Sequence, residues 1–168
     1  MKGWSFIVAA MVTSCALVVA PVVAAFEKRL ILNTTASAPL GFYWLDGRAP
    51  RAGDLALVRP PMDLARWMAS RRYLPLNVPL IKRIAAVKGQ SVCIQAGVVH
   101  IDGVAVARVL DRDRLGRTLT ASTLCRHLGP GEIFLLNADP RSLDGRYFGP
   151  LPRQTVVGRL TPLWTWER

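Results

Sequence analysis

The sequence predicts a mainly β domain with one short helix, preceded by an apolar helix at the N-terminus. Short apolar runs are separated by Gly, Pro and Asp turns about every 8–12 residues, which is typical of antiparallel β proteins. Within the domain, residues 62–72 form the best stretch of apolar residues at helical spacing, and the chain opens with a long uncharged run. We therefore expect two parts, residues 1–26 and a single domain over residues 27–168.

The first 26 residues have the features of a targeting or membrane segment. Residues 4–26 carry no charge, Lys2 precedes them, and the run is long enough to span a bilayer. The small residues at 22–25 would also permit cleavage after Ala25, as in a secretory signal peptide. A signal peptide and a membrane anchor both remain open, and either predicts a domain outside the cytoplasm. The length and uniformity of the run disfavour a buried core helix.

The first half of the domain predicts strands followed by a helix. An aromatic strand at 42–45 ends at an Asp-Gly turn, and an apolar strand at 55–58 ends at two prolines. These prolines are suited to start the helix over 62–72. Trp67 and Met68 are expected to pack against the sheet, and an exposed face that contacts lipid or a partner is the open alternative.

The second half predicts further strands and two hairpins. An apolar run interrupted by two basic residues ends in a Lys-Gly turn, and Ala-Gly and Asp-Gly pairs mark the hairpins. Residues 163–166, with two tryptophans, are expected to form an edge strand or to touch the membrane interface. The expected strands are 80–87, 91–94, 98–101, 104–109, 132–136, 148–152 and 156–160.

The net charge is strongly positive, at +11, but the basic residues are dispersed. Small clusters occur at 71–72, 82–83 and 112–117, without a lysine-rich tail or a basic strip interleaved with aromatic residues. Nucleic acid is therefore not expected as a partner. Attraction to anionic lipid headgroups explains this charge equally well, so the membrane is an expected partner.

The cysteine and histidine pattern indicates one disulfide and no metal site. Cys93 and Cys125 both lie in the domain, and in an oxidising compartment we expect them to pair. Cys15 lies in the apolar run and is expected to be a small buried side chain. The chain has no CxxC motif, and His100 and His127 lack the paired spacing of zinc ligands. We expect no metal and no cofactor.

A candidate nucleophile, Ser37, lies in the stretch 34–43. Pro39 fixes φ two residues later and Gly41 permits a tight turn, so the hydroxyl is expected to be held in place. Such stretches are also common in ordinary turns, so the argument needs a base elsewhere in the chain. His100 and Asp102 could complete a Ser-His-Asp triad with Ser37, but the spacing of these residues does not require it.

Lys82 is the alternative base. It lies in the apolar strand expected at 80–87, where side-chain alternation places it on the opposite face from Arg83. On an apolar face the ammonium form is disfavoured, so the pKa falls and the neutral amine can accept a proton. A strand lysine that reaches solvent is the simpler alternative.

Three separated segments match one family in chain order. They are Ser37-Ala38-Pro39 with Gly41 and Tyr43, the run at 81–89, and the run at 137–150 with its Ser-x-Asp-x-Arg-Tyr-Phe-Gly motif. With these segments, the chain resembles the signal peptidase I superfamily of Ser-Lys proteases, which implies a signal-peptidase-like antiparallel β fold. In its short length, and in the absence of a methionine after the serine, the chain is most similar to the TraF-like branch of conjugative-transfer peptidases.

The resemblance implies catalytic roles for three side chains. Ser37 Oγ would attack the scissile carbonyl. Lys82 would take the hydroxyl proton and later return it to the leaving amine. Ser142 matches the family position whose hydroxyl orients the lysine.

The resemblance also implies supporting roles. Thr35 matches a hydroxyl that forms the oxyanion hole together with the Ser37 backbone N–H. Asp144 and Arg146 match a pair that supports the third segment, and Asp144 is implied to be needed for activity through a structural role.

The function that the resemblance implies is maturation of a pilin precursor for plasmid transfer. The expected substrate is a small membrane protein that is cleaved at its C-terminal end and joined head to tail. The expected partners are the membrane and the conjugative transfer apparatus, on the periplasmic side of the bacterial inner membrane. Two alternatives remain open: general removal of signal peptides, and a non-catalytic, membrane-tethered scaffold of a transfer apparatus.

Overall fold

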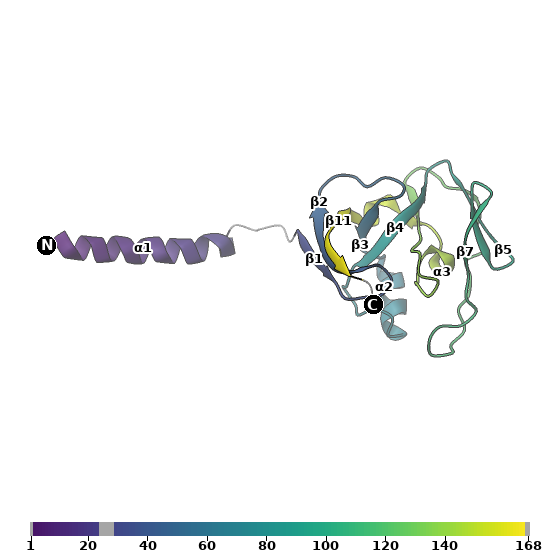
Figure 1. The fold of residues 1–168 in the computed structure, drawn as a ribbon, viewed down its shortest axis with the longest axis horizontal. Helices are drawn as coiled ribbons and strands as arrows, with labels where there is room; N and C mark the ends of the chain where they lie inside the picture. The colour runs from purple at the N-terminus through teal and green to yellow at the C-terminus, as the bar shows by residue number, and fades with distance from the viewer. Residues whose placement is uncertain (1, 24–28, 167–168) are drawn as a thin grey trace.

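The computed structural model describes residues 2–23 and 29–166, and its N-terminal element is helix α1 (Lys2–Val23) (Figure 1). Within the described residues, no helix has both the length and the hydropathy that a membrane crossing requires. The possible cleavage point after Ala25 lies outside the described residues, so the role assigned to residues 1–26 stays a prediction. Cys15, expected to be buried, is exposed on α1, since this helix contributes no residue to the core clusters.

A seven-stranded sheet forms the larger part of the domain, and its neighbouring strands are antiparallel. The strand order is β1-β2-β11-β3-β4-β9-β10. The strands are β1 (Leu30–Asn33), β2 (Leu40–Asp46), β3 (Leu55–Val58), β4 (Leu80–Val87), β9 (Glu132–Leu135), β10 (Leu151–Pro152) and β11 (Val156–Trp166). The prediction of a mainly antiparallel β domain is confirmed.

Strand β11 lies inside the main sheet, between β2 and β3. The sequence predicted a short strand at 156–160 and a separate edge or interfacial segment at 163–166. The structure joins them into one strand, whose first half pairs with β3 and whose second half pairs with β2 alone. The register shifts between Pro162 and Trp164, as expected where proline interrupts a ladder of hydrogen bonds.

Gly41 has a different role from the one predicted. It lies within β2 rather than in the serine turn, at a φ of +138°. A Cβ atom at this position would lie 2.1 Å from the carbonyl oxygen of Trp164 on β11. The glycine therefore allows β11 to approach the start of β2 closely.

A smaller four-stranded sheet has the order β7-β6-β5-β8. Its strands are β5 (Ser91–Gln95), β6 (Val98–Ile101), β7 (Val104–Arg108) and β8 (Cys125–His127). Figure 1 shows β5 and β7 at the opposite end of the domain from β1 and β2. Cys93 and Cys125 lie opposite each other on β5 and β8, and a disulfide joins them.

Two short helices complete the domain, together with a 3₁₀ turn at Arg153–Thr155. Helix α2 (Met62–Ser70) begins after the two prolines, and its Met68 side chain is buried in a core cluster with strand residues such as Val58. Trp67 is exposed and contacts the Tyr73 ring and the Arg71 guanidinium instead of the sheet. Helix α3 (Gly145–Phe148) lies within the third family-like segment.

Candidate active site

Ser37 lies in the turn between β1 and β2, which the buried side chain of Asn33 fastens. The Asn33 amide donates hydrogen bonds of 3.0, 3.1 and 3.0 Å to three turn carbonyls, those of Thr35, Ala38 and Pro39. The buried Tyr43 hydroxyl donates to the Pro39 carbonyl at 2.6 Å. The turn is thus fixed mainly by side-chain hydrogen bonds to its backbone.

Lys82 lies on β4, on the face that also carries the core residues Leu80 and Ile84. Its side chain is only 3% exposed, whereas Arg83 points to solvent, as strand alternation predicts. Lys82 Nζ donates a hydrogen bond of 2.6 Å to Ser142 Oγ. This is the single hydrogen bond of the ammonium group within the described residues, so most of its solvation is lost.

Burial lowers the pKa of Lys82 from 10.5 to about 8. The Asp144 carboxylate opposes this shift by raising the pKa, and the Arg146 guanidinium lowers it. About half of the Lys82 side chains are then neutral at pH 8, and about one-tenth at pH 7. A neutral amine is therefore available at physiological pH.

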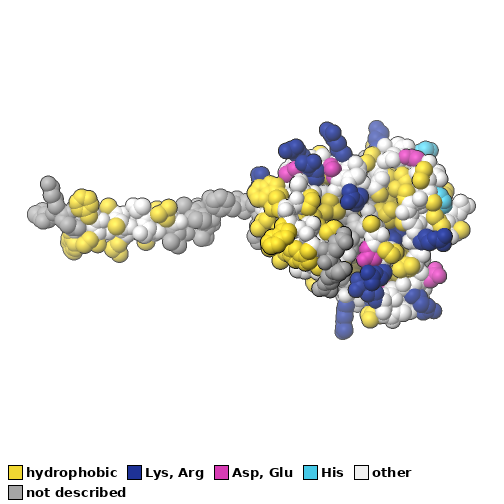
Figure 2. Space-filling model, viewed as in Figure 1, with side chains coloured by type: hydrophobic (Ala, Val, Ile, Leu, Met, Phe, Trp, Pro, Cys, Tyr) yellow, Lys and Arg dark blue, Asp and Glu magenta, His cyan; other side chains and the backbone are white. Residues whose placement is uncertain are grey.

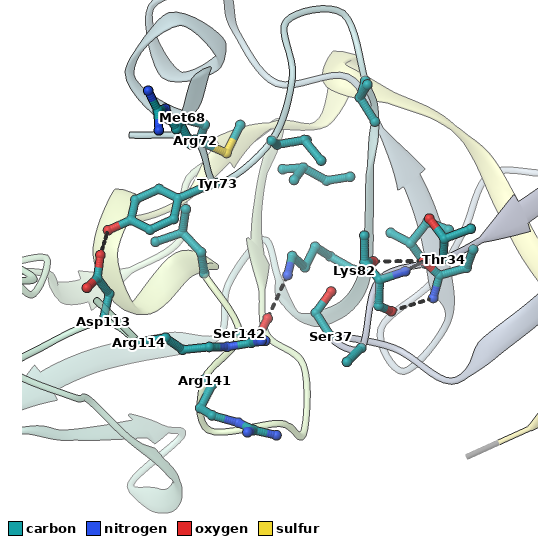
Figure 3. Close-up of a pocket in the computed structure, with 18 of the residues that line it drawn as sticks. Thr34, Ser37, Met68, Arg72, Tyr73, Lys82, Asp113, Arg114, Arg141 and Ser142 are labelled. Atoms are coloured by element: carbon teal, nitrogen blue, oxygen red, sulfur yellow. Dashed lines mark hydrogen bonds between the residues drawn. The ribbon is translucent and has the colours of Figure 1, made fainter. Parts of the chain in front are cut away.

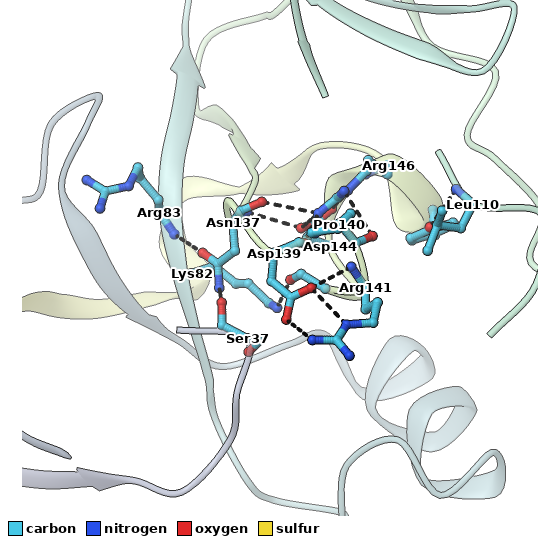
Figure 4. Close-up of polar contacts among 12 residues, drawn as sticks. Ser37, Lys82, Arg83, Leu110, Asn137, Asp139, Pro140, Arg141, Asp144 and Arg146 are labelled. Atoms are coloured by element: carbon cyan, nitrogen blue, oxygen red, sulfur yellow. Dashed lines mark hydrogen bonds and ion pairs between the residues drawn. The ribbon is translucent and has the colours of Figure 1, made fainter. Parts of the chain in front are cut away.

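Ser142 is carried by a loop that a buried ion pair holds in shape (Figure 4). Arg146 and Asp144 are 1% and 0% exposed, and the guanidinium donates two hydrogen bonds of 2.8 Å to the carboxylate. Arg146 also donates to four backbone carbonyls, those of Arg108, Asn137, Asp139 and Pro140. Because its partners are all present, the pair fixes the backbone that precedes and follows Ser142.

Asn137 connects the serine turn to the lysine strand (Figure 4). Its side-chain amide donates to the Ser37 carbonyl at 2.6 Å and to the Ile81 carbonyl at 3.1 Å. Its side-chain oxygen accepts from the Arg83 backbone N–H at 2.9 Å. The two residues on either side of Lys82 are thereby linked, through one buried side chain, to the backbone of Ser37.

Ser37, Lys82 and Ser142 line one cavity of about 1010 Å³ (Figure 3). Figure 3 shows Ser37 beside the Lys82 side chain, whose amine is directed to Ser142. Thr35 also lines the cavity, whereas Asp144 and Arg146 lie behind it. The structure thus brings together the Ser37 hydroxyl, the Lys82 amine and the Ser142 hydroxyl from three distant parts of the chain.

The Thr35 hydroxyl is engaged within the serine turn. It donates a hydrogen bond of 2.8 Å to Asn33 Oδ1, which also accepts from the Thr35 backbone N–H at 3.0 Å. Since a hydroxyl has a single proton, Thr35 would have to rotate to donate to an oxyanion. Its role in an oxyanion hole stays a prediction.

The histidine alternative receives no support from the arrangement. His100 lies on β6 and does not line the cavity with Ser37. Asp102 accepts hydrogen bonds from Gln90 and Ser91 in the small sheet. His127 contacts the Gly89 carbonyl and likewise lies outside the cavity lining.

Comparison with known proteins defines the class of this protein. The family model described as signal peptidase, peptidase S26, matches residues 4–165, and the chain therefore belongs to this family. A conjugal transfer protein TraF from Agrobacterium fabrum is 34% identical over 81% of this chain and 82% of its own length. A plasmid transfer protein TraF from Escherichia coli is 29% identical over 85% of this chain and 87% of its own.

A solved structure was also matched, with a more distant relationship. A signal peptidase I from Enterococcus faecalis V583 is 24% identical, with a TM-score of 0.42, over 68% of this chain and 98% of that chain.

Two asparagines of the site were not singled out from the sequence. Asn33 precedes the serine segment, and Asn137 opens the third segment without an assigned role. Asn33 binds backbone groups within its own turn, whereas Asn137 binds backbone groups of residues far away in the sequence, so the importance of Asn137 depends on tertiary contacts. Their polarity beside apolar strands, where an unpartnered amide would be costly, is the signal that could have identified them.

Proposed function

We propose that the protein is a serine endopeptidase in which Ser37 is the nucleophile and Lys82 the general base. The main support is the buried Lys82 amine, which shares a cavity with the Ser37 hydroxyl and donates to Ser142. A lysine with a pKa of about 8 can act as a base near neutral pH without a histidine.

The proposed reaction moves one proton through Lys82. The neutral amine takes the proton of Ser37 Oγ while Oγ bonds to the scissile carbonyl carbon. When the tetrahedral intermediate collapses, Lys82 returns the proton to the leaving nitrogen, and the C–N bond breaks. The Ser37 backbone N–H, and Thr35 after rotation, would stabilise the oxyanion. An acyl-enzyme on Ser37 remains.

The proposed biological role is maturation of a pilin precursor during plasmid transfer. The support is the membership of the peptidase S26 family together with the names of the TraF relatives, which refer to conjugal or plasmid transfer. The substrate's own N-terminal amine would resolve the acyl-enzyme and close a head-to-tail peptide bond, since a tethered amine has a high effective concentration. General signal-peptide removal, with water as the acceptor, is the second candidate, because the family itself is named for it.

We further propose that the domain lies on the periplasmic side of the inner membrane. The disulfide between Cys93 and Cys125 supports an oxidising compartment. Apolar side chains lie opposite one another across β1, β2 and β11, in a row where the exposed Leu32 and Trp164 flank the half-buried Phe42. In Figure 2, hydrophobic atoms gather over this end of the domain, and we define this row together with Trp166 as the aromatic face.

Mass spectrometry of candidate small pilins, produced with the wild-type chain or with Ser37→Ala or Lys82→Met, tests the proposal. Either variant should abolish maturation while circular dichroism shows a folded β domain. A cyclic product would be lighter by one water than the linear product of hydrolysis. Normal maturation with both variants would contradict an enzymatic role and favour the scaffold.

A further inference from the structure

The cavity that contains Ser37 and Lys82 is strongly basic. Among the described residues other than Lys82, the charged side chains that line it are one carboxylate and five guanidinium groups, those of Arg72, Arg112, Arg114, Arg117 and Arg141. Three of the five come from the loop between β7 and β8, which contributes residues 110–119 to the lining. We call residues 112–114 together with Arg141 the arginine arm of the cavity.

The lining carboxylate, Asp113, already accepts hydrogen bonds from Tyr73 and from groups of its own loop. Asp113 accepts hydrogen bonds of 2.6 Å from both the Tyr73 hydroxyl and Arg117 Nε. It also accepts from the backbone N–H groups of Leu115 and Arg117. Asp113 therefore neutralises Arg117 and orders the loop, and it does not offset the charge of the other lining arginines.

Within the described residues, three of the five lining guanidinium groups have no carboxylate partner: those of Arg72, Arg112 and Arg114. Arg112 donates a side-chain hydrogen bond to the Gly116 carbonyl, and Arg114 makes no hydrogen bond or salt bridge within the described residues. Arg114 influences the Asp139 carboxyl through space alone, and that carboxylate is already paired with Arg141 at 3.3 Å. Three exposed cations in the cavity wall, two of them in the arginine arm, are thus available to a ligand.

The arginine arm lies on one side of the proposed catalytic pair. In Figure 3, Arg114 extends toward Ser142, which lies across the Lys82 amine from Ser37. The β1 residues Leu30, Ile31 and Leu32, which precede the serine turn, also line the cavity. The lining therefore combines apolar residues of the strand that leads to Ser37 with cations beside Ser142.

If the proposed peptidase function is right, this asymmetry indicates where the two halves of a substrate bind in the cavity. The amine that returns a proton to the leaving nitrogen must contact the segment that follows the scissile bond. That segment consequently lies on the Lys82 and Ser142 side, toward Arg112 and Arg114. Guanidinium groups bind carboxylates through paired, charge-assisted hydrogen bonds.

We propose that the arginine arm is a subsite for a carboxylate in the segment that leaves, and that it determines which proteins are cleaved. The carboxylate is either an Asp or Glu side chain or the α-carboxylate at the substrate's C-terminus. In either case, a substrate with a short acidic segment after the cleavage site is favoured over one with a basic segment.

Cleavage of matched peptides by the full-length chain tests this inference. The peptides span the cleavage site found by mass spectrometry and differ only after the cut: Glu with an amidated terminus, Gln with a free terminus, Gln with an amidated terminus, and Lys with an amidated terminus. The inference predicts that one of the first two has a kcat/KM at least about fivefold above that of the neutral peptide, with the lysine peptide lowest. The better of the first two identifies the source of the carboxylate.

Variants of the arm complete the test. Arg114→Gln should reduce the preference for the carboxylate, and Arg114→Glu should reverse it in favour of the lysine peptide. Arg51→Gln, an exposed arginine outside the cavity lining, should change neither. Equal cleavage of all four peptides would overturn the inference and leave the peptidase function intact, whereas cleavage of none would overturn both. Loss of binding to anionic phosphatidylglycerol vesicles in Arg114→Gln, with unchanged peptide preference, would assign the arm to lipid and also overturn the inference.

Discussion

At the scale of single residues, the site depends on the solvation of one amine. Lys82 is nearly inaccessible to water and has Ser142 Oγ as its hydrogen-bond acceptor. A lowering of its pKa from 10.5 to about 8 means that burial disfavours the charged form by roughly 3 kcal/mol relative to water. By burying this one side chain, the fold makes a neutral amine available as the base that the proposed reaction needs.

The pH dependence should reveal this amine. We expect kcat/KM for peptide cleavage to rise through about pH 8 and to level off above it, because only neutral Lys82 accepts a proton. The stability has the same sign. Between about pH 8 and 10.5 the unfolded chain binds the proton and the folded chain does not, so the free energy of unfolding should rise with pH. Denaturant titrations of Lys82→Met, which lacks the titrating group, should not show this rise.

Asn137 should be a positioning residue. Asn137→Ala removes the links to the backbone of Ser37, Ile81 and Arg83, so the hydroxyl and the amine lose their fixed separation. We expect kcat to fall by about 10- to 100-fold with KM changed by less than about threefold. Steady-state kinetics measured well below the melting temperature of the variant separate this effect from unfolding. A change confined to KM, or to stability alone, would argue against positioning.

At the scale of elements, three separate strands or their adjoining loops carry the residues of the site, and each is held in place by different contacts. The turn after β1 is fastened by Asn33, β4 presents Lys82, and the loop after β9 is shaped by the Asp144–Arg146 pair. None of these elements contains the site alone. The close contact of β2 with β11 at Gly41 adds a fourth constraint, since β2 begins where the serine turn ends.

Two glycines of the same strand region offer a matched comparison. Gly41→Ala should destabilise the domain by about 2–4 kcal/mol, because its Cβ would meet the Trp164 carbonyl and its φ is positive. Gly47→Ala, at a position with no atom within 4 Å of the added Cβ, should change the stability by less than about 0.5 kcal/mol. Urea unfolding followed by fluorescence measures both. Equal effects would mean that β11 can move away from β2 at little cost.

At the scale of the whole molecule, the two ends of the main sheet have different surfaces. The end formed by β1, β2 and β11 carries the aromatic face, and Trp164 there is 71% exposed. The Trp164 and Trp166 rings lie edge to face, 6.2 Å apart. Tryptophan at such a surface favours the boundary between water and lipid, and the proposed location beside a membrane follows from this preference.

Quenching of tryptophan fluorescence by brominated lipids should test this orientation. With the full-length chain in vesicles, Trp164→Phe should decrease the quenched fraction of the emission, because it removes an indole in contact with lipid. Trp67→Phe should increase that fraction, because Trp67 lies on α2 against the Tyr73 ring and is not part of the aromatic face. Changes of the same sign in both variants would contradict a membrane contact through β11.

Much of this organisation could be predicted from the sequence, with physical reasons for the exceptions. Turn residues and strand periodicity located most strands, and alternation placed Lys82 and Arg83 on opposite faces. The path of β11 could not be predicted, because an internal proline divides its strand pattern in two. In addition, β11 pairs with β2, which is far away in the sequence. Trp67 was expected to pack against the sheet, but it lies at the surface, where Tyr73 and Arg71 contact its ring. The residues Asn33 and Asn137 act through contacts that periodicity does not encode.

The central place of β11 has a consequence for the life of the protein. Among the described strands, β11 (Val156–Trp166) is the last in chain order, and without it the main sheet would have a gap between β2 and β3. The turn with Ser37 lies beside the β1-β2 pair on one side of this gap, and Lys82 lies on β4 on the other side. The proposed nucleophile and base should consequently reach their final separation only after β11 has entered the sheet, late in the folding of the chain.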